Sequence, residues 1–388
     1  MRVVLVAICL LIATVYGFPK WHQLEKYTFE HYVRQARRPY VKGTQQWKER
    51  EAIFNARLED IKQHNADGTK SWKRGINQFS DWTQDEWRDY NRGRPSKASH
   101  STLPTNVFKA TRDPNSLPRI HDYRFNVNPP VLTGIKNQGS CGSCWAHSAT
   151  ESVESFFALK YGQLPVLSTQ QVTSCTPAWF GCGGGSFVGG WDALARHGGL
   201  NEEWTYGYSN FFAPEMSPSV THPCRNITAE FPNVTADGKT FTFTWWPKAN
   251  VSGFTMVTPN DAHATMEALA TVGPLSISVA SDTWADYESG ILHNNYTDTA
   301  SNYTWQEINH DVQLVGYGFD NDLQQNFWVV RNSWGTNYGE QGYIRLYRPE
   351  HEPCGDLTGQ KICGTSGLLL NPGYPHVMTL EDQNGFYF

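Results

Sequence analysis

The chain has 388 residues, of which 39% are hydrophobic and 14% are aromatic. This composition can bury more than one sizeable core, and it excludes a disordered or low-complexity protein. The net charge of −5 is unevenly placed, because residues 18–115 carry +7 and residues 116–388 carry −13. A basic segment can bind nucleic acid or a membrane. Acidic residues are interleaved in this one, however, and an acidic partner lies in the same chain, so the charges favour an intramolecular role over nucleic-acid binding.

The first 17 residues have the pattern of a signal peptide. Met1 and Arg2 precede a short apolar run that ends near Gly17. A signal anchor is the alternative, but the run is too short to span a bilayer well, and no other stretch approaches about 18 consecutive apolar residues. We therefore expect a protein of the secretory pathway, either lysosomal or extracellular, without a stable membrane anchor.

Secretion changes how the eight cysteines are interpreted. Cys9 leaves with the signal peptide, so seven cysteines remain in an oxidising compartment and one is left over from pairing. Such a cysteine forms either an intermolecular bridge or a reactive thiol. Five N-x-S/T sequons agree with secretion and predict a glycosylated surface. They lie at Asn226, Asn233, Asn250, Asn295 and Asn302.

In chain order, the first predicted element is an amphipathic helix over residues 46–65, which has apolar residues at helical spacing. These are Trp47, Phe54, Leu58 and Ile61. A linker rich in Ser, Pro and Thr follows at residues 92–118. A second helix is predicted from Cys144 to Tyr161, closed by Gly162. The later half has short β-type runs at residues 275–279, 312–317 and 327–331. The sequence therefore predicts helices in the earlier part of the chain and a β-sheet in the later part.

The most specific motif is Gln-Gly-Ser-Cys-Gly-Ser-Cys-Trp over residues 138–145, which ends at the start of the second predicted helix. A helix N-terminus and a nearby imidazolium both stabilise a thiolate, and together they can lower a cysteine pKa from about 8.5 to as low as 3 to 4. Cys144 has the first of these by its position. On this motif, the sequence resembles the papain superfamily in the layout of cathepsin L, over about residues 47–375.

The resemblance implies an α+β papain-like fold of two domains. A helical left domain and an antiparallel, β-barrel-like right domain would enclose the cleft, after a helical propeptide. His310 would pair with Cys144 and later protonate the leaving amine. Asn332 would orient the imidazole, and Trp334 would screen that hydrogen bond from water. Gln138 would supply a side-chain N–H that forms the oxyanion hole with the backbone N–H of Cys144.

Each of these residues also has an ordinary structural interpretation. His310 could be a core residue, Asn332 a turn former and Gln138 a polar loop residue. Their common order within the family's flanking motifs favours catalysis. The spacing departs from the family, because His310 and Asn332 follow Cys144 by 166 and 188 residues, against roughly 130 to 150 in the family. An insertion at about residues 209–256 would account for the excess.

With Cys144 kept as a thiol, the family pattern implies two disulfides and leaves two cysteines that should pair with each other. The pairs are Cys141 with Cys182, Cys175 with Cys224, and Cys354 with Cys363. The third pair departs from the family, in which the partner of Cys363 lies just before the catalytic histidine.

Residues 18–115 resemble an inhibitory propeptide, and residues 116–388 would form the peptidase domain. Two propeptide motifs of the cathepsin L type occur in order. The first is matched at Arg50, Phe54, Ile61 and Asn65 but not at Gln46 and Arg57, and the second at Gly75, Asn77, Phe79 and Asp81. A generic amphipathic helix is the alternative interpretation. Because a basic propeptide on an acidic enzyme is held partly by charge, we expect release at acidic pH.

The resemblance also implies the substrate cleft. Glycine backbones would pair with an extended peptide, and four side chains would line S2, the pocket for the P2 residue. The substrate-binding candidates are Gly184, Gly185, Phe187, Ser278, Ile308, Leu368 and Trp334. Because Leu368 is not acidic, we expect a hydrophobic P2 residue and disfavoured P2 arginine. No cofactor or metal is implied.

The resulting hypothesis is a monomeric cysteine endopeptidase that acts on proteins or peptides, is inhibited by its own propeptide, and could bind cystatin-type inhibitors. A glycosylated binding protein on an inactive papain-like fold is the alternative from another class, and an exopeptidase is the alternative within the family. Two residues are atypical: His147, which could pack or hydrogen-bond near Cys144, and Asp311, which could raise the pKa of His310.

Overall fold

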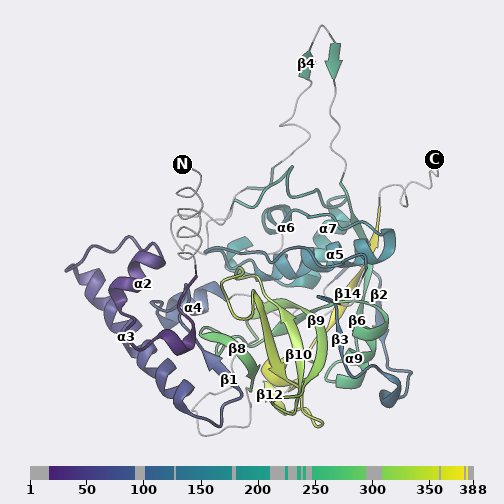
Figure 1. Cartoon of the computed structure of the whole chain (residues 1–388). Helices are drawn as coiled ribbons and strands as arrows, with labels where there is room; N and C mark the ends of the chain where they lie inside the picture. Colours follow the sequence, from purple (N-terminus) through teal and green to yellow (C-terminus); the bar gives the residue numbers. More distant parts are fainter. Residues whose placement is uncertain are drawn as a thin grey trace, which may run out of the picture.

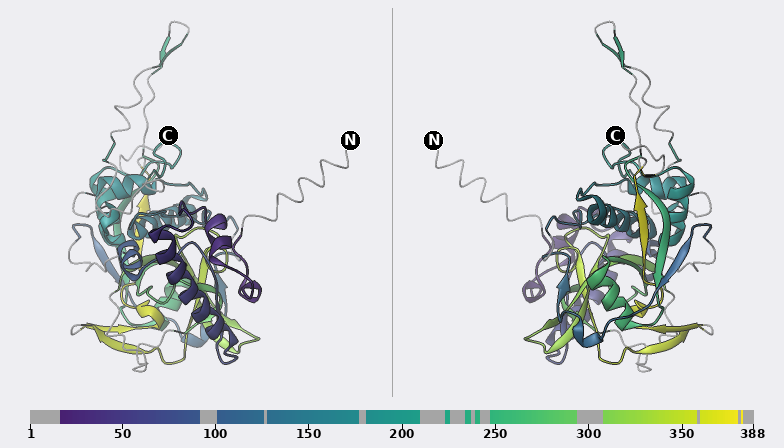
Figure 2. Two further views of the ribbon diagram at one scale, coloured as in Figure 1. Left: turned by 90° about the vertical axis from the view of Figure 1, so that its left-hand side faces the viewer. Right: turned by 90° about the vertical axis from the view of Figure 1, so that its right-hand side faces the viewer.

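The computed structural model describes residues 17–91, 101–125, 128–176, 181–209, 223–225, 234–236, 239–241, 247–293, 308–357, 360–379 and 382. Residues 1–16 of the predicted signal peptide lie outside the described residues, as do the sequons at Asn226, Asn233, Asn295 and Asn302. The prodomain helices stand to one side of two joined lobes, with helix α5 above the strands of the larger sheet (Figure 1). A quarter-turn view shows the prodomain lying against the front of both lobes (Figure 2).

The helices are few and mostly short. They are α2 (Phe29–Gln35), α3 (Gln45–Ala66), α4 (Gln84–Tyr90), α5 (Cys144–Tyr161), α6 (Thr169–Cys175), α7 (Phe187–Arg196) and α9 (Ala262–Thr271), with 3-10 turns η1 (Trp21–Gln23), η3 (Pro114–Ser116), η4 (Gly181–Gly183) and η6 (Thr365–Gly367). In the part of the chain that the structure describes, none of them has the length and apolar character needed to cross a bilayer.

The strands belong to one large sheet and two hairpins. They are β1 (Trp72–Arg74), β2 (Thr105–Phe108), β3 (His121–Asp122), β4 (Val234–Ala236), β5 (Lys239–Phe241), β6 (Asn250–Val257), β7 (Leu275–Val279), β8 (Tyr287–Leu292), β9 (His310–Asp320), β10 (Gln325–Arg331), β11 (Tyr343–Tyr347), β12 (Cys354–Leu357), β13 (Gln360–Cys363) and β14 (Gly373–Met378).

The prodomain is built around α3, which confirms the helix predicted over residues 46–65. The four apolar residues that predicted this helix are its buried residues. They pack with Phe29, Tyr32 and Val33 of α2 in a core of their own. The hydroxyl of Thr44 accepts a hydrogen bond from the N–H of Trp47 and so fixes where the helix begins.

Helix α5 is the centre of the left lobe, and its predicted limits are also confirmed. It begins at Cys144 and ends where Gly162 adopts a φ of 70°, a conformation that glycine takes without strain. Its buried face packs on α6, α7 and strands β9 and β14, and its side chains Trp145 and Val153 share a core with Trp191 of α7. Cys144 is thereby fixed between a packed helix and the second lobe.

The right lobe is formed by the large sheet, in the order β1-β8-β11-β10-β9-β7-β14-β6-β2, with β3 on β9. The three predicted β-type runs form β7, the centre of β9 and most of β10. The pairing is antiparallel except between β8 and β11 and between β2 and β6. The resemblance implied an antiparallel, β-barrel-like lobe, and most of the strand pairs are antiparallel. Among the described residues, the outer strands β1 and β2 do not pair with each other, so the sheet is open rather than a closed barrel.

The predicted insertion at about residues 209–256 overlaps strand β6 at its C-terminal end. Residues 250–256 belong to β6, which pairs with β14 and β2 inside the large sheet. Asn250, one of the five sequons, is only 2% exposed at the start of this strand. We therefore expect no glycan on Asn250 of the folded protein.

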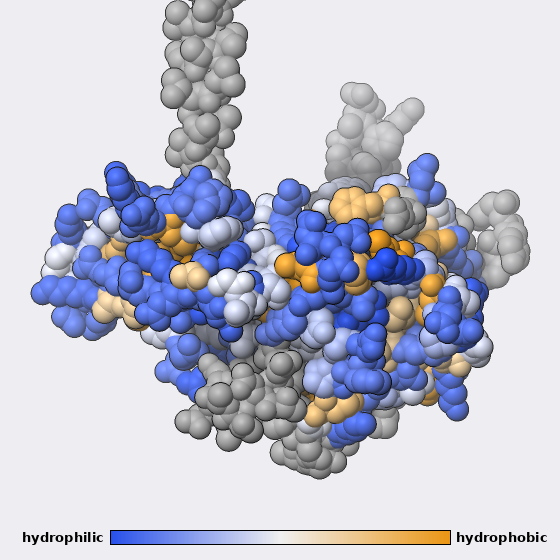
Figure 3. Space-filling model, turned by 60° about the horizontal axis from the view of Figure 1, so that its bottom comes forward, coloured by the Kyte–Doolittle hydropathy of each residue, from blue (hydrophilic) through white to orange (hydrophobic). Residues whose placement is uncertain are grey.

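The molecular surface in Figure 3 is mostly hydrophilic, with apolar side chains in small separate areas. No broad apolar surface is visible on this face. Singly exposed apolar residues of this kind are normal for a folded protein in water.

Candidate active site

Cys144 lies at the first position of α5 and is fully buried. It is the one cysteine of the described residues outside a disulfide. The three disulfides are Cys141–Cys182, Cys175–Cys224 and Cys354–Cys363, which is the pairing that the resemblance implied. The bridge from Cys141 fixes the loop just before the helix. The departure from the family at Cys354 is explained by the β12–β13 hairpin, which places Cys354 directly opposite Cys363.

His310 begins strand β9, and its ring is oriented by Asn332. The Nε2 atom of His310 lies 2.8 Å from Oδ1 of Asn332. Since the amide oxygen is an acceptor only, Nε2 carries the hydrogen. Asn332 Oδ1 also accepts from the backbone N–H of Ser333, which fixes the orientation of the amide. The other ring nitrogen, Nδ1 of His310, is buried and has no hydrogen-bond partner. It is therefore the nitrogen that can exchange a proton with a reacting group.

Trp334 covers this pair. Its ring stacks on the imidazole of His310 with 4.7 Å between the ring centroids. Trp334 is itself fully buried. Removing water from around the hydrogen bond of His310 with Asn332 strengthens that bond, because competing hydrogen bonds to solvent are excluded.

Gln138 is fully buried, and both its side chain and its backbone are hydrogen-bonded. Its Oε1 accepts from the hydroxyl of Ser333 at 2.8 Å, and its Nε2 donates to the carbonyl oxygen of Cys141 at 3.0 Å. Its backbone N–H donates to the carbonyl of Ser333 at 2.9 Å. The contact with the carbonyl oxygen of Cys141, which can only accept, identifies the nitrogen of the amide. The second hydrogen on Nε2 therefore stays available for an oxyanion.

Burial lowers the pKa of His310 to about 4, partly offset by the hydrogen bond with Asn332. The imidazole is consequently neutral in this covered state at neutral pH. Asp311 does not act on it as the sequence suggested. Its carboxylate accepts from the hydroxyl of Ser278 at 2.6 Å and from the N–H of Phe187 at 3.0 Å.

The prodomain covers the site through aromatic side chains. The rings of Phe79, Trp87 and Tyr90 lie 5.4, 5.2 and 6.0 Å from the ring of Trp334. The side-chain amide of Gln78 donates to the carbonyl of Trp334 at 2.9 Å. Phe79, Trp87 and Tyr90 are buried in the core of the right lobe, so this part of the prodomain is an extension of that core.

The basic prodomain is also held by charge and by strand pairing. Strand β1 adds antiparallel to the edge of β8. Asp286, next to β8, accepts from Arg74 at 2.6 Å and from Arg57 at 3.3 Å. Arg57 is one of the two departures from the propeptide motif. It serves here as a contact with the peptidase domain, which that motif match could not indicate.

The two glycines predicted to line the cleft are explained by backbone conformation and by packing. Gly184 has a φ of 110°, in the region that favours glycine. A Cβ atom on Gly185 would lie 2.6 Å from the ring of Trp145. The structure of the protein therefore requires glycine at both positions, whether or not a peptide is bound.

The four side chains predicted to line S2 are all buried. Asp311 connects two of them, because its carboxylate binds Ser278 and the backbone of Phe187. The other two pack in separate clusters, Leu368 with the right-lobe core and Ile308 with Ala280 and Ile362. The sequence prediction therefore missed an acidic group beside two of its S2 candidates. Among the described residues, no group of His, Cys, Asp and Glu is arranged to hold a metal ion.

Comparison with known proteins agrees with this geometry. The profile of the papain family cysteine proteases matches residues 117–363. The chain belongs to this family of cysteine proteases. The profile of the cathepsin propeptide inhibitor domain matches residues 29–87, so the protease carries its own inhibitory propeptide.

Relatives and solved structures extend the similarity over most of the protease. A probable cysteine protease of Arabidopsis thaliana is 33% identical over 78% of this chain and 72% of its own. Cathepsin L of Sarcophaga peregrina is 30% identical over 92% of this chain and 98% of its own. The recombinant stem bromelain precursor has a TM-score of 0.69 at 26% identity and covers 89% of this chain and 97% of its own. The digestive procathepsin L2 of Tenebrio molitor has a TM-score of 0.67 at 25% identity and covers 89% of this chain and 98% of its own.

Proposed function

We propose that this protease is an endopeptidase made as an inactive zymogen, with Cys144 as nucleophile and His310 as its proton-transfer partner. The observation that carries the proposal is the orientation of His310. One ring nitrogen is bound to Asn332 at 2.8 Å, and the other is buried without a hydrogen-bond partner. A histidine held this way can take a proton from a thiol and return it to a leaving amine.

In this mechanism, Cys144 gives its proton to Nδ1 of His310, and the sulfur attacks the carbonyl carbon of the substrate. The carbonyl oxygen becomes an oxyanion, which receives hydrogen bonds from Nε2 of Gln138 and from the N–H of Cys144. The C–N bond then breaks as His310 passes its proton to the leaving amine. A water molecule, deprotonated by His310, hydrolyses the thioester and restores the thiol.

The covered zymogen is inactive for two physical reasons. The aromatic side chains of the prodomain occupy the face of Trp334, so a substrate has no access. Burial also lowers the pKa of His310 to about 4. The imidazolium form is therefore disfavoured until the prodomain leaves and water returns to the site.

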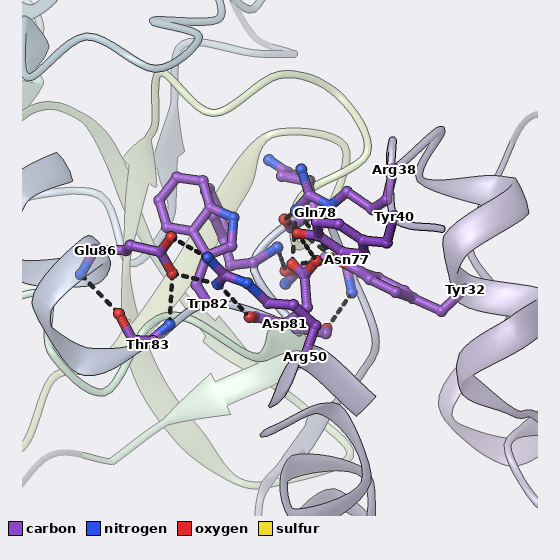
Figure 4. A network of polar contacts seen from close by, with 12 residues as sticks. Tyr32, Arg38, Tyr40, Arg50, Asn77, Gln78, Asp81, Trp82, Thr83 and Glu86 are labelled. Atoms are coloured by element: carbon purple, nitrogen blue, oxygen red, sulfur yellow. Dashed lines mark hydrogen bonds and ion pairs between the residues drawn. The ribbon is translucent and has the colours of Figure 1, made fainter. Parts of the chain in front are cut away.

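Acid release of the prodomain is proposed to depend on Glu86. Burial by itself would raise the pKa of Glu86, but hydrogen bonds from Arg50 and Thr83 outweigh it and lower this pKa below its usual 4.5. The ionised Glu86 therefore stabilises the folded prodomain fully above its usual pKa, and this stabilisation is lost as the pH falls through the lowered pKa. The two bonds with Arg50 are 2.5 and 2.6 Å long (Figure 4).

Glu288 affects the stability of the docked prodomain in the opposite direction to Glu86 as the pH falls. Burial raises its pKa, although Lys20 of the prodomain counteracts part of the shift. Its contribution favours the docked prodomain at low pH and is lost as the pH rises. Acid release should therefore proceed through loosening of the prodomain around Arg50 and Glu86, and not through this carboxylate at the interface.

We expect the purified precursor to process itself at about pH 4.5 and to remain intact at neutral pH. In a Glu86→Gln variant, the ion pair with Arg50 is lost at every pH, so processing should begin at a higher pH. The matched control is Glu25→Gln, which makes the same change at an exposed position of the prodomain. The onset is measured by gel electrophoresis across a pH series. Processing at neutral pH but not in acid would overturn the proposal.

A hydrophobic P2 residue is proposed for the substrate, because Phe187, Ile308 and Leu368 are apolar. Asp311 adds a pH dependence to this preference. Burial raises the pKa of Asp311 to about 7, partly offset by its hydrogen bonds from Ser278 and Phe187. The carboxyl group is thus uncharged in acid and becomes an anion near neutral pH.

We therefore expect peptides with P2 leucine to exceed those with P2 arginine in kcat/KM at pH 5, and this ratio to fall towards pH 8. An Asp311→Asn variant should keep a constant ratio across that range. Fluorogenic peptides that differ only at P2 provide the measurement. Faster cleavage of P2 arginine at pH 5 would reject the assignment of the pocket.

The remaining parts of the proposal concern location and partners. The N-terminal signal pattern, the disulfides and the sequons support passage through the secretory pathway to a lysosome or the cell exterior. Protein substrates and cystatin-type inhibitors would compete for the cleft that the prodomain now covers. We propose that the protease acts as a monomer.

A further inference from the structure

Three polar side chains next to the oxyanion-hole residue form a hydrogen-bonded chain that the catalytic assignment does not use. The hydroxyl of Tyr208, in the loop after α7, lies 2.9 Å from the carbonyl oxygen of Gln138 and 2.6 Å from the hydroxyl of Ser143. Ser143 directly precedes Cys144. Its own carbonyl oxygen lies 3.0 Å from Nδ1 of His147. Ser143 and His147 are buried, and Tyr208 is half-buried.

The direction of each hydrogen bond in this chain is fixed. Burial raises the pKa of Tyr208 although the bond with Ser143 lowers it, so the phenol keeps its proton. The carbonyl of Gln138 can only accept, so Tyr208 donates to it and Ser143 must donate to Tyr208. The carbonyl of Ser143 likewise only accepts, so the hydrogen of His147 is on Nδ1.

His147 is a neutral donor in this chain. Burial lowers its pKa to about 3, which the bond to Ser143 only partly offsets. A proton-transfer role would need a pKa closer to the working pH. The ring of His147 also meets the ring of Tyr208 edge to face, with 5.1 Å between centroids. It therefore supports Tyr208 from the side as well as holding Ser143.

Ser143 stands at the N-cap of α5 but makes no capping hydrogen bond with its side chain. A serine at this position usually accepts a hydrogen bond from a backbone N–H of the first helical turn. Because the hydroxyl accepts no such bond here, it does not compete for the N–H groups that face a developing negative charge at Cys144.

The same chain continues on the opposite side of Gln138. The backbone N–H of Gln138 donates to the carbonyl of Ser333, and the hydroxyl of Ser333 donates to the amide oxygen of Gln138. Ser333 in turn donates its N–H to Asn332, which holds His310. Gln138 is thus clamped by Tyr208 from the left lobe and by Ser333 from the right lobe.

We propose that Tyr208 is a positioning residue of this active site, which with Ser143 holds Gln138 in register with the start of α5. The two oxyanion donors come from different segments, and the bond from Tyr208 to the backbone of Gln138 links them. The inference rests on the proposed cysteine-protease mechanism. Tyr208 takes no part in the attack or in the proton transfers of that mechanism, so its proposed role is to position Gln138.

The test is a Tyr208→Phe variant of the activated protease, which removes one hydroxyl and keeps the ring. We expect kcat to fall about tenfold with KM nearly unchanged, less than the about 100-fold loss from removing an oxyanion donor itself. The affinity of a peptide aldehyde, whose adduct with Cys144 carries an oxyanion, should fall by a similar factor. Alkylation of Cys144 by iodoacetamide forms no oxyanion and should keep its rate.

The matched control is Tyr206→Phe, which makes the same change two residues away. The hydroxyl of Tyr206 accepts from the N–H of Arg225 at 3.0 Å and lies outside this chain. We expect normal kinetics for this variant. Ser143→Ala should lower kcat in the same direction as Tyr208→Phe, and the double variant should be no worse than Tyr208→Phe alone.

The outcomes separate the inference from the mechanism on which it rests. A folded Tyr208→Phe variant with unchanged kcat, or with alkylation slowed as much as turnover, would overturn the positioning role. Should this variant fail to fold, Ser143→Ala decides the question by the same measurements. An unmodified protease without activity or thiol labelling after activation would instead refute the proposed function.

Discussion

Replacing Cys144 by alanine should abolish peptide hydrolysis, with kcat at least about 10⁶-fold lower, the loss typical of removing a covalent nucleophile. The thiol is the only group at the start of α5 that the proposed mechanism uses for attack on the carbonyl. No other residue of the described site can form the thioester. We expect the precursor of this variant to remain uncleaved in acid as well.

The measurement is hydrolysis of a fluorogenic peptide, together with labelling by an active-site thiol alkylator. The unmodified protease should lose its activity as one cysteine is labelled, and Cys144→Ala should show no rapid labelling. The variant should keep its prodomain and its three disulfides, which mass spectrometry can verify. Retained hydrolysis in this variant would mean a different nucleophile. An unmodified chain that neither hydrolyses peptides nor reacts would favour the binding-protein alternative.

Replacing Gln138 by alanine should lower kcat by about 100- to 1000-fold with little change in KM. The Nε2 hydrogen that stays available in the structure meets the oxyanion only when that charge develops. A Gln138→Glu variant keeps the size of the side chain but offers an acceptor, so it should be at least as impaired. This pair of variants separates hydrogen-bond donation from packing.

Gln163→Ala provides the matched control for this prediction. Gln163 is exposed just beyond the C-terminal end of α5, where its side chain accepts from Lys248. We expect normal turnover in this control and an unchanged rate of Cys144 alkylation in both Gln138 variants. If Gln138→Ala raised KM and left kcat intact, its side chain would act on substrate binding and not on the transition state.

The helices α3 and α5 were predictable because the apolar residues that recur at helical spacing in the sequence are the residues that the helices bury. Phe54, Leu58 and Ile61 recur at helical spacing and are all buried. Cys144 could likewise be placed at the start of α5 from the apolar period and from Gly162 at its end. The strand runs were found for the same reason, since β7 is continuously apolar or small and fully buried.

Closure of the sheet could not be predicted in this way. Whether the outer strands of a sheet meet depends on tilt and register accumulated over many strands, and not on any local pattern. Here the outer strands are β1 and β2, and both precede the residues that match the papain family profile. The third disulfide, by contrast, could be predicted because Cys354 and Cys363 were the two cysteines left over from the family pattern, and the β12–β13 hairpin places them opposite each other.

The sequence alone determined the family and predicted Cys144, His310 and Asn332 as the catalytic residues, because each stands in a local motif that resembles the family's. The tertiary structure decided what surrounds them. Tyr208 contacts Gln138 across 70 positions of sequence, and Asp311 turns from His310 towards Phe187. Such contacts depend on how helices and strands pack, so no local pattern of residues could have indicated them.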